Sequence, residues 1–190
     1  MLKKGDKTKQ SIISESKKLF SKRGYATVTM KDICEICDLS RGGLYRYFGS
    51  TKEIFIEILN EDKEDAEKIL RESIANNVSA IELLQAFLHE RKITTILGDS
   101  QGLVFAIQEF AHIESDHHDY MRERCQSAVS ALSLLLQYGQ EQGDFKCFDV
   151  HSTALHILLL LDSLESNAKV LGFSEEVVDS QFNILYSLVV

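Results

Sequence analysis

The sequence predicts an all-α protein of about nine helices, with a three-helix helix-turn-helix domain at residues 1–50 and a helical-bundle domain at residues 51–190. Three observations support this prediction. The chain of 190 residues contains no proline, the commonest helix breaker. Apolar residues recur at the three- and four-residue spacing of amphipathic helices along nearly the whole chain. Glycines and capping residues such as Ser40 and Ser174 divide it into segments.

The first four helices are predicted at residues 6–23, 29–37, 41–48 and 51–73. Gly24 ends the first helix, and Thr29 caps the second. Residues 38–40 form a three-residue turn, in which Asp38 takes a left-handed conformation and Ser40 caps the third helix. Cys34 is the small residue where the second and third helices cross. The angle between them is filled by Ile33, Leu39 and Leu44. This spacing is typical of a helix-turn-helix.

Five longer helices follow, predicted at residues 79–97, 103–113, from 115 to the glycines at 139–143, 150–171 and 174–190, with a loop at 98–102. The helix at 150–171 is apolar on nearly every side up to Leu161, so it must be covered on both sides. The last helix offers a second apolar stripe. Its predicted inward positions are Val177, Val178, Gln181, Phe182, Leu185 and Leu188. These two helices therefore predict a homodimer with an isologous four-helix interface.

Charge is divided unevenly between the two parts of the chain. Residues 1–55 carry 12 Lys and Arg against 6 Asp and Glu, whereas residues 56–190 carry 9 against 23. The formal net charge of −8 thus combines +6 with −14. A basic terminal module suits a polyanion, because Lys and Arg displace its condensed counterions. The acidic overall balance does not exclude a nucleic-acid partner.

One continuous segment carries a family resemblance. It reads Thr29-Met-Lys-Asp-Ile-Cys-Glu-Ile-Cys-Asp-Leu-Ser-Arg-Gly-Gly-Leu-Tyr-Arg-Tyr-Phe-Gly-Ser-Thr-Lys-Glu-Ile-Phe55, preceded by a helix that ends Leu19-Phe20-x-x-x-Gly24-Tyr25. This segment resembles the DNA-binding domain of the TetR family of transcriptional regulators. The resemblance implies a dimer that binds a palindromic double-stranded operator, with the third helix in the major groove. Such half-sites lie one helical turn apart, roughly 34–36 Å centre to centre.

Ten residues fall on the DNA-contacting positions that the resemblance implies: Thr29, Lys31, Arg41, Gly42, Gly43, Tyr45, Arg46, Tyr47, Thr51 and Lys52. Arginine can bond a guanine edge with two hydrogen bonds, and tyrosine hydroxyls suit phosphates. Glycines in a helix cost about 1 kcal/mol each relative to alanine, so we expect Gly42 and Gly43 to allow close approach of the backbone to DNA. The family usually has lysine at the position of Thr51. Which of Thr51 and Lys52 reaches a phosphate stays open.

The resemblance also implies a small apolar or amphipathic effector that releases the repressor from DNA. Candidate effector contacts are aromatic and polar residues of the second domain, namely Phe87, Phe105, Gln108, Glu109, His112, Tyr138, His156 and Asp162. No cofactor or metal is expected. The longest apolar run, Leu155 to Leu161, is far too short for a membrane span, so no membrane partner is expected. Four cysteines without a secretion signal predict reduced thiols and a cytoplasmic location.

Two other functions stay open. A helical-bundle metal-dependent enzyme is one, with the pairs Glu109/His112 and Glu114/His117 as ligands. The nearby segment 116–119, with two aspartates and two histidines, is a candidate site for a divalent metal. A protein-interaction module whose basic helix pair does not bind DNA is the other. Cys34 and Cys37 have the spacing of metal ligands, but a packing role on the second helix is favoured.

Overall fold

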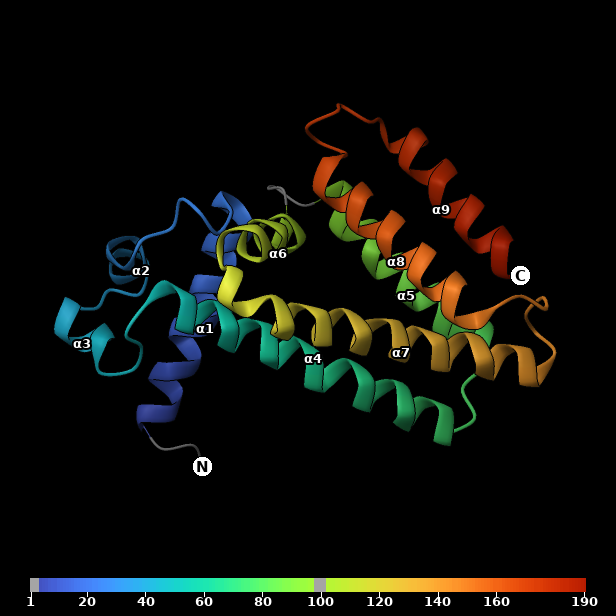
Figure 1. Ribbon diagram of the computed structural model, residues 1–190, viewed down its shortest axis with the longest axis horizontal. Helices are drawn as coiled ribbons and strands as arrows, with labels where there is room; N and C mark the ends of the chain where they lie inside the picture. Colours follow the sequence, from blue (N-terminus) through green and yellow to red (C-terminus); the bar gives the residue numbers. More distant parts are fainter. Residues whose placement is uncertain (1–3, 98–101) are drawn as a thin grey trace.

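The computed structural model describes residues 4–97 and 102–190, with the backbone alone at residues 4, 62–67 and 97. These residues form nine α-helices, one 3-10 turn and no strand, which confirms the all-α prediction (Figure 1). The helices are α1 (Lys4–Arg23), α2 (Met30–Ile36), α3 (Arg41–Tyr45), α4 (Thr51–Ala75), α5 (Ala80–Leu97), α6 (Gly102–Ile113), α7 (His118–Gln142), α8 (Val150–Asn167) and α9 (Glu175–Val189); the turn η1 (Ser115–His117) precedes α7.

Three predicted boundaries are wrong. The third helix ends at Tyr45 and not at residue 48, because the chain turns to bury Phe48 in the core. The helix α7 begins only at His118, after η1. Its predicted end at residues 139–143 is confirmed, because Gly143, with a φ of +79°, caps the helix after Gln142. A β-carbon at Gly139 would lie 2.0 Å from the buried Phe145 ring, so this glycine makes room for the ring and does not end the helix. The helix α8 ends at Asn167 and not at residue 171.

Two hydrophobic cores hold the molecule together. The first is built by α1, α2, α3 and the first half of α4, and it also contains Ala106 and Phe110 of α6. The second is built by α5, α7, α8 and α9. The long helices α4 and α7 pack along each other between the two (Figure 1). The helix α6 packs against α1 at least as extensively as against α8.

Aromatic rings join α6 to the N-terminal helices. The rings of Phe20, Tyr25 and Phe55 pack together, and Tyr25 and Phe55 also contact the ring of Phe110 in α6. The His117 ring packs against the Phe110 ring. The centroids of neighbouring rings lie 4.9–5.9 Å apart. Edge-to-face and offset pairs of this kind contribute beyond their buried area. A displacement of α6 is therefore transmitted to α1 and α4.

A strip of apolar side chains is exposed on α8 and α9. It consists of Leu155, Leu159, Val177, Ile184 and Leu188. The prediction that Val177 and Leu188 point inward is wrong, because the buried register of α9 is Val178, Phe182, Leu185 and Val189. An exposed apolar patch marks a candidate interaction site. None of the helices in the described ranges is long and apolar enough to cross a bilayer.

Candidate nucleic-acid interface

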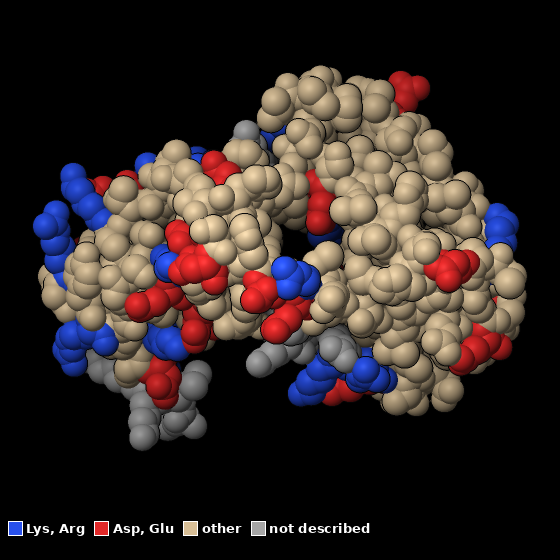
Figure 2. Space-filling model, viewed as in Figure 1, with Lys and Arg blue, Asp and Glu red and all other residues tan. Residues whose placement is uncertain are grey.

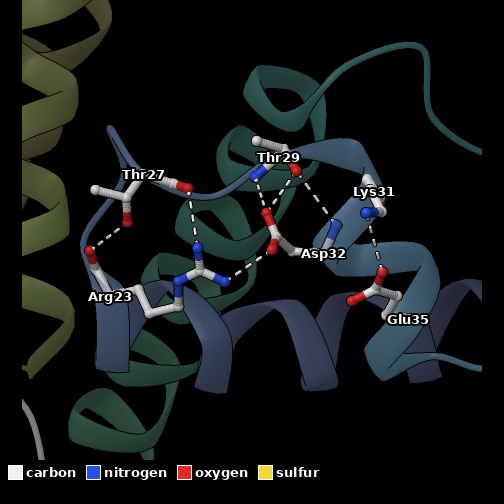
Figure 3. A network of polar contacts seen from close by, with 6 residues as sticks. All are labelled: Arg23, Thr27, Thr29, Lys31, Asp32 and Glu35. Atoms are coloured by element: carbon white, nitrogen blue, oxygen red, sulfur yellow. Dashed lines mark hydrogen bonds and ion pairs between the residues drawn. The ribbon is translucent and has the colours of Figure 1, made fainter.

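The start of α2 is fixed by a capping box. The hydroxyl of Thr29 accepts a hydrogen bond from the backbone N–H of Asp32, and the Asp32 carboxylate accepts one from the Thr29 N–H at 2.8 Å. Arg23 at the end of α1 donates to the same carboxylate at 2.8 Å, and it also reaches the carbonyl of Thr27 (Figure 3). Asp32 thus ties α2 to α1. The prediction that Thr29 caps this helix is confirmed.

Asp32→Ala is expected to lower the free energy of unfolding by about 1 kcal/mol, the usual cost of losing a helix cap. Hydrogen bonds from Thr29 and Arg23 lower the pKa of Asp32 below its ordinary value of 3.8. The stabilisation is therefore complete above that value and is lost as the pH falls below it. Urea unfolding at pH 7 and in acid should show the difference between the two proteins shrinking in acid. The control is Glu35→Ala, which breaks only a 3.7 Å surface pair with Lys31.

The turn and the recognition helix have the predicted geometry. Asp38 has a φ of +52°, and Ile33, Cys34 and Leu44 are buried where α2 and α3 meet. Ser40 caps α3 by accepting from the Gly43 N–H at 3.1 Å. A β-carbon at Gly43 would lie 3.2 Å from that hydroxyl, whereas one at Gly42 would meet nothing within 4 Å. Gly43 thus gives room to the cap, and Gly42 leaves the backbone of α3 uncovered.

Apart from the buried Leu44, the side chains of α3 face solvent at one end of the molecule. Arg41, Tyr45 and Arg46 are exposed, Tyr45 to 54%. Neither arginine has a hydrogen bond or ion pair with any residue in the described part of the chain. Lys31 of α2 is also exposed, while Tyr47 packs partly against the first core. Figure 2 shows Lys and Arg gathered at this end, over α2 and α3. The surface is cationic and sterically open, as a polyanion requires.

Lys52 does not share this surface. Its ammonium lies 3.1 Å from the carboxylate of Glu114 and 3.1 Å from that of Asp116. Tyr25 donates its hydroxyl proton to the other oxygen of Glu114 at 2.6 Å. The contacts with Glu114 and Asp116 raise the pKa of Lys52, and those with Tyr25 and Lys52 lower the pKa of Glu114. Hydrogen bonds with His117 and then Lys52 hold the pKa of Asp116 at about 2. All three groups are therefore charged at neutral pH.

Metal ligation has one candidate group in the described ranges. Glu114, Asp116 and His117 have ligand atoms within 4.8 Å of one another, and two of these residues already hold Lys52. The other predicted ligand pair, Glu109 and His112, makes contacts of its own. Glu109 accepts a hydrogen bond from the Ala26 N–H at 3.2 Å. His112 is exposed, and its Nδ1 lies 2.7 Å from the carbonyl of Gln108 in its own helix.

The candidate effector residues lie in several places. Phe105 and Glu109 contact Gly24 at the end of α1, and Gln108 and His112 lie on the same helix, α6. Phe87 and Tyr138 pack against the second core, where the Tyr138 hydroxyl donates to the Val78 carbonyl at 3.1 Å. The remaining two lie on α8: His156 is exposed, and Asp162 pairs with Arg91 of α5 at 2.7 Å.

A charged cluster joins α5 to α8 beside the start of α6. Arg91 contacts Asp162 and, at 3.2 Å, Glu165, whose side chain is only 5% exposed. Burial raises the pKa of Glu165, and its Oε2 accepts no hydrogen bond. A β-carbon at Gly102, the first residue of α6, would lie 3.0 Å from this carboxylate. Figure 2 shows a hollow between the parts of the surface formed by α6 and α8. No pattern in the sequence indicates Arg91 or Glu165 as members of a site.

Similar proteins were found at the level of sequence and of fold. Residues 12–58 match the model of the family "Bacterial regulatory proteins, tetR family". The uncharacterized HTH-type transcriptional regulator YfiR of Bacillus subtilis is 31% identical over 180 residues, which cover 92% of this chain and 85% of YfiR. The HTH-type transcriptional repressor NicS of Pseudomonas putida is 27% identical over 170 residues, or 84% of this chain and 74% of NicS.

Solved structures share the whole fold. The regulatory protein TetR from Rhodobacter sphaeroides superposes with a TM-score of 0.79 at 16% identity, over 95% of this chain and 98% of that one. AibR, crystallised with isovaleryl coenzyme A and operator DNA, superposes with a TM-score of 0.67 at 18% identity, over 94% of this chain and 98% of AibR. At these identities the likeness concerns the fold.

Proposed function

The chain belongs to the TetR family of bacterial regulatory proteins and is a helix-turn-helix transcriptional regulator, and we propose that it represses transcription by binding a palindromic operator as a homodimer until a small-molecule effector releases it. The observation that carries the proposal is the exposed α3, where Arg41 at its start and Arg46 just after its end have no partner within the described residues. Side chains that are unpaired and cationic are available for base edges and phosphates.

Each half-site is read by α3. Arg41 begins the helix, and Tyr45 and Arg46 lie one turn later on its solvent side. Arg41 is the residue for a guanine edge, because its planar guanidinium donates two parallel hydrogen bonds. Lys31 and Thr29 at the start of α2 and Thr51 at the start of α4 are proposed phosphate neighbours. Gly42, which no side chain covers, allows the backbone to approach the groove.

The dimer is proposed to form through the exposed apolar strip of α8 and α9. Leu155 and Leu159 are exposed four residues apart on α8, and Ile184 and Leu188 are exposed at the same spacing on α9. A two-fold axis brings such a strip onto its own copy and buries it in a four-helix interface. The acidic balance of residues 56–190 keeps the rest of this half away from DNA.

The effector is proposed to bind between α6 and α8, where the Arg91, Asp162 and Glu165 cluster supplies buried polar groups. One guanidinium faces two carboxylates there, so a ligand that donates hydrogen bonds suits the cluster better than an anion does. A ligand that moves α6 acts on α1 and α4 through the shared aromatic cluster. A thermal-shift screen of the wild type and Glu165→Gln tests this site, which is supported if hits lose their effect in the variant.

Arg41→Ala is expected to weaken operator binding about 10- to 100-fold and to relax sequence preference at one position of each half-site, as the loss of a bidentate base contact does. The measurement is binding to duplexes from the region upstream of the chain's own gene, at several salt concentrations. Lys68→Ala is the matched control, because Lys68 is a basic residue on the exposed surface of α4 whose ion-pair partner in the described part of the chain is Glu72.

Absence of salt-dependent binding to any duplex contradicts a DNA-binding function and favours a protein-interaction module. Equal binding by the wild type and Arg41→Ala contradicts the assignment of α3 as the reading helix. Stoichiometric metal in protein purified without chelator favours the enzyme alternative.

A further inference from the structure

Two carboxylates, one in α6 and one just after it, hold the helix pair α2–α3 in place at the junction between α6 and the N-terminal helices. Glu109 of α6 accepts a hydrogen bond from the Ala26 N–H in the α1–α2 loop, and Glu114, just after α6, contacts both Tyr25 and Lys52. Tyr25 precedes α2 and Lys52 follows α3 along the chain. The Glu114 carboxylate therefore contacts the chain both before α2 and after α3.

The Glu114 contacts are specific. The Tyr25 hydroxyl is 2.6 Å from Oε1, the Lys52 ammonium is 3.1 Å from Oε2, and the Glu114 side chain is mostly buried. Charge-assisted hydrogen bonds of this kind are directional, and in partly desolvated surroundings they are stronger than surface ion pairs. Asp116 adds a second contact to Lys52 from the following turn. No residue of α2 or α3 takes part, so the network sets the placement of these helices without being part of the reading surface.

We infer that Glu114, with Tyr25 and Lys52, is a positioning network that fixes the orientation of α2 and α3 on α6 and thereby sets the half-site spacing that the dimer accepts. The inference rests on the proposed function. It also gives Lys52 a role in place of the phosphate contact predicted for it, because its ammonium is already held by two carboxylates.

Geometry explains why spacing is the sensitive quantity. The helix α3 lies at the end of the molecule opposite α9, so a small rotation at the junction displaces it along the DNA (Figure 1). In a two-fold dimer the displacement occurs in both subunits, so the separation of the two reading helices changes by the sum of the two displacements. A shift of one base pair in the operator is only about 3.4 Å. Binding to one half-site does not depend on this separation.

The experiment compares Lys52→Met, Glu114→Gln and Tyr25→Phe with the wild type on three kinds of duplex. These are the operator, operators lengthened or shortened by one base pair between the half-sites, and a single half-site. We expect each variant to bind the operator about tenfold more weakly and to lose most of its preference over the altered spacings, the size of a typical coupling between sites. Half-site affinity and its salt dependence should stay as in the wild type.

Arg122→Gln is the matched control. It breaks another ion pair near the junction, that of Arg122 with Asp119 at 2.7 Å, but it contacts neither Tyr25 nor Lys52. Its spacing preference should be that of the wild type. Tyr25→Phe keeps the buried ring and removes only the hydroxyl, so it tests the network in a protein whose first core is intact.

Two results overturn the inference while leaving the proposed function in place. If Lys52→Met lowers half-site affinity and reduces the salt slope by about 0.9, Lys52 is a phosphate contact. If all three variants bind the operator and keep the wild-type spacing preference, the network does not position the helices. Failure of the wild type to bind any duplex contradicts the proposed function itself.

Discussion

Leu159→Glu is expected to convert the dimer into a monomer and to weaken binding to the palindromic operator at least about 100-fold, or about 3 kcal/mol. Leu159 is 61% exposed on α8, so its replacement leaves the fold of one chain almost unchanged. In an isologous interface every substitution occurs twice, and two carboxylates would be buried without a partner. Sedimentation equilibrium and operator binding measure the two effects.

The control for this variant is Ile69→Glu. Ile69 is 60% exposed, close to the 61% of Leu159, but it lies on α4 and outside the strip on α8 and α9. We expect Ile69→Glu to remain dimeric and to bind the operator like the wild type. A Leu159→Glu protein that stays dimeric contradicts the proposed interface.

Gly24→Ala is expected to lower the free energy of unfolding by about 2–4 kcal/mol, which combines the cost of a left-handed non-glycine residue with that of overpacking. Gly24 ends α1 with a φ of +77°, and a β-carbon there would lie 2.3 Å from Oε2 of Glu109 and 2.9 Å from the Phe105 ring. The displaced α6 should also weaken operator binding. Urea unfolding and operator titration are the measurements.

Two further variants separate the causes. In the double variant Gly24→Ala with Glu109→Ala, removal of the carboxylate should recover part of the loss, seen as a favourable coupling in a double-mutant cycle. The φ strain should remain. Gly5→Ala, in the first turns of α1 where nothing lies within 4 Å, should be neutral or stabilising by up to about 1 kcal/mol. A Gly24→Ala protein as stable as Gly5→Ala would contradict the close packing of Gly24 against α6.

Helix positions were predictable because their signals are local. Thr29, Ser40 and Ser174 each cap the helix that immediately follows, and periodicity within a helix is read over a few residues. The same short range explains the left-handed Asp38 and the buried Leu44 of the helix pair. The boundary errors have another origin. The helix α3 ends before residue 48 because Phe48 packs into the first core, a tertiary contact that no pattern in the sequence indicates.

The reading surface was predictable in type, and the junction was not. Exposure of Arg41 and Tyr45 follows from the helical register of α3. Lys52, in contrast, is held by residues 62 and 64 positions away, and Tyr25 reaches a carboxylate 89 positions away. The sequence around Lys52 does not indicate that its ammonium lies between two carboxylates. Contacts at such separations depend on how helices pack, which spacing along the chain does not specify.

The sharing of the first core has a consequence for recombining regulators. A chimaera that joins residues 1–50 to another protein's effector domain would leave behind Phe55 and Phe110, which are fully buried against α1 in the native chain. The transplanted piece would then expose the faces of Phe20 and Tyr25 to water. The transferable unit is α1 to α3 together with the start of α4 and all of α6, two segments separated in the chain. A cut at the end of α3 therefore divides this core and does not isolate a self-contained helix-turn-helix unit.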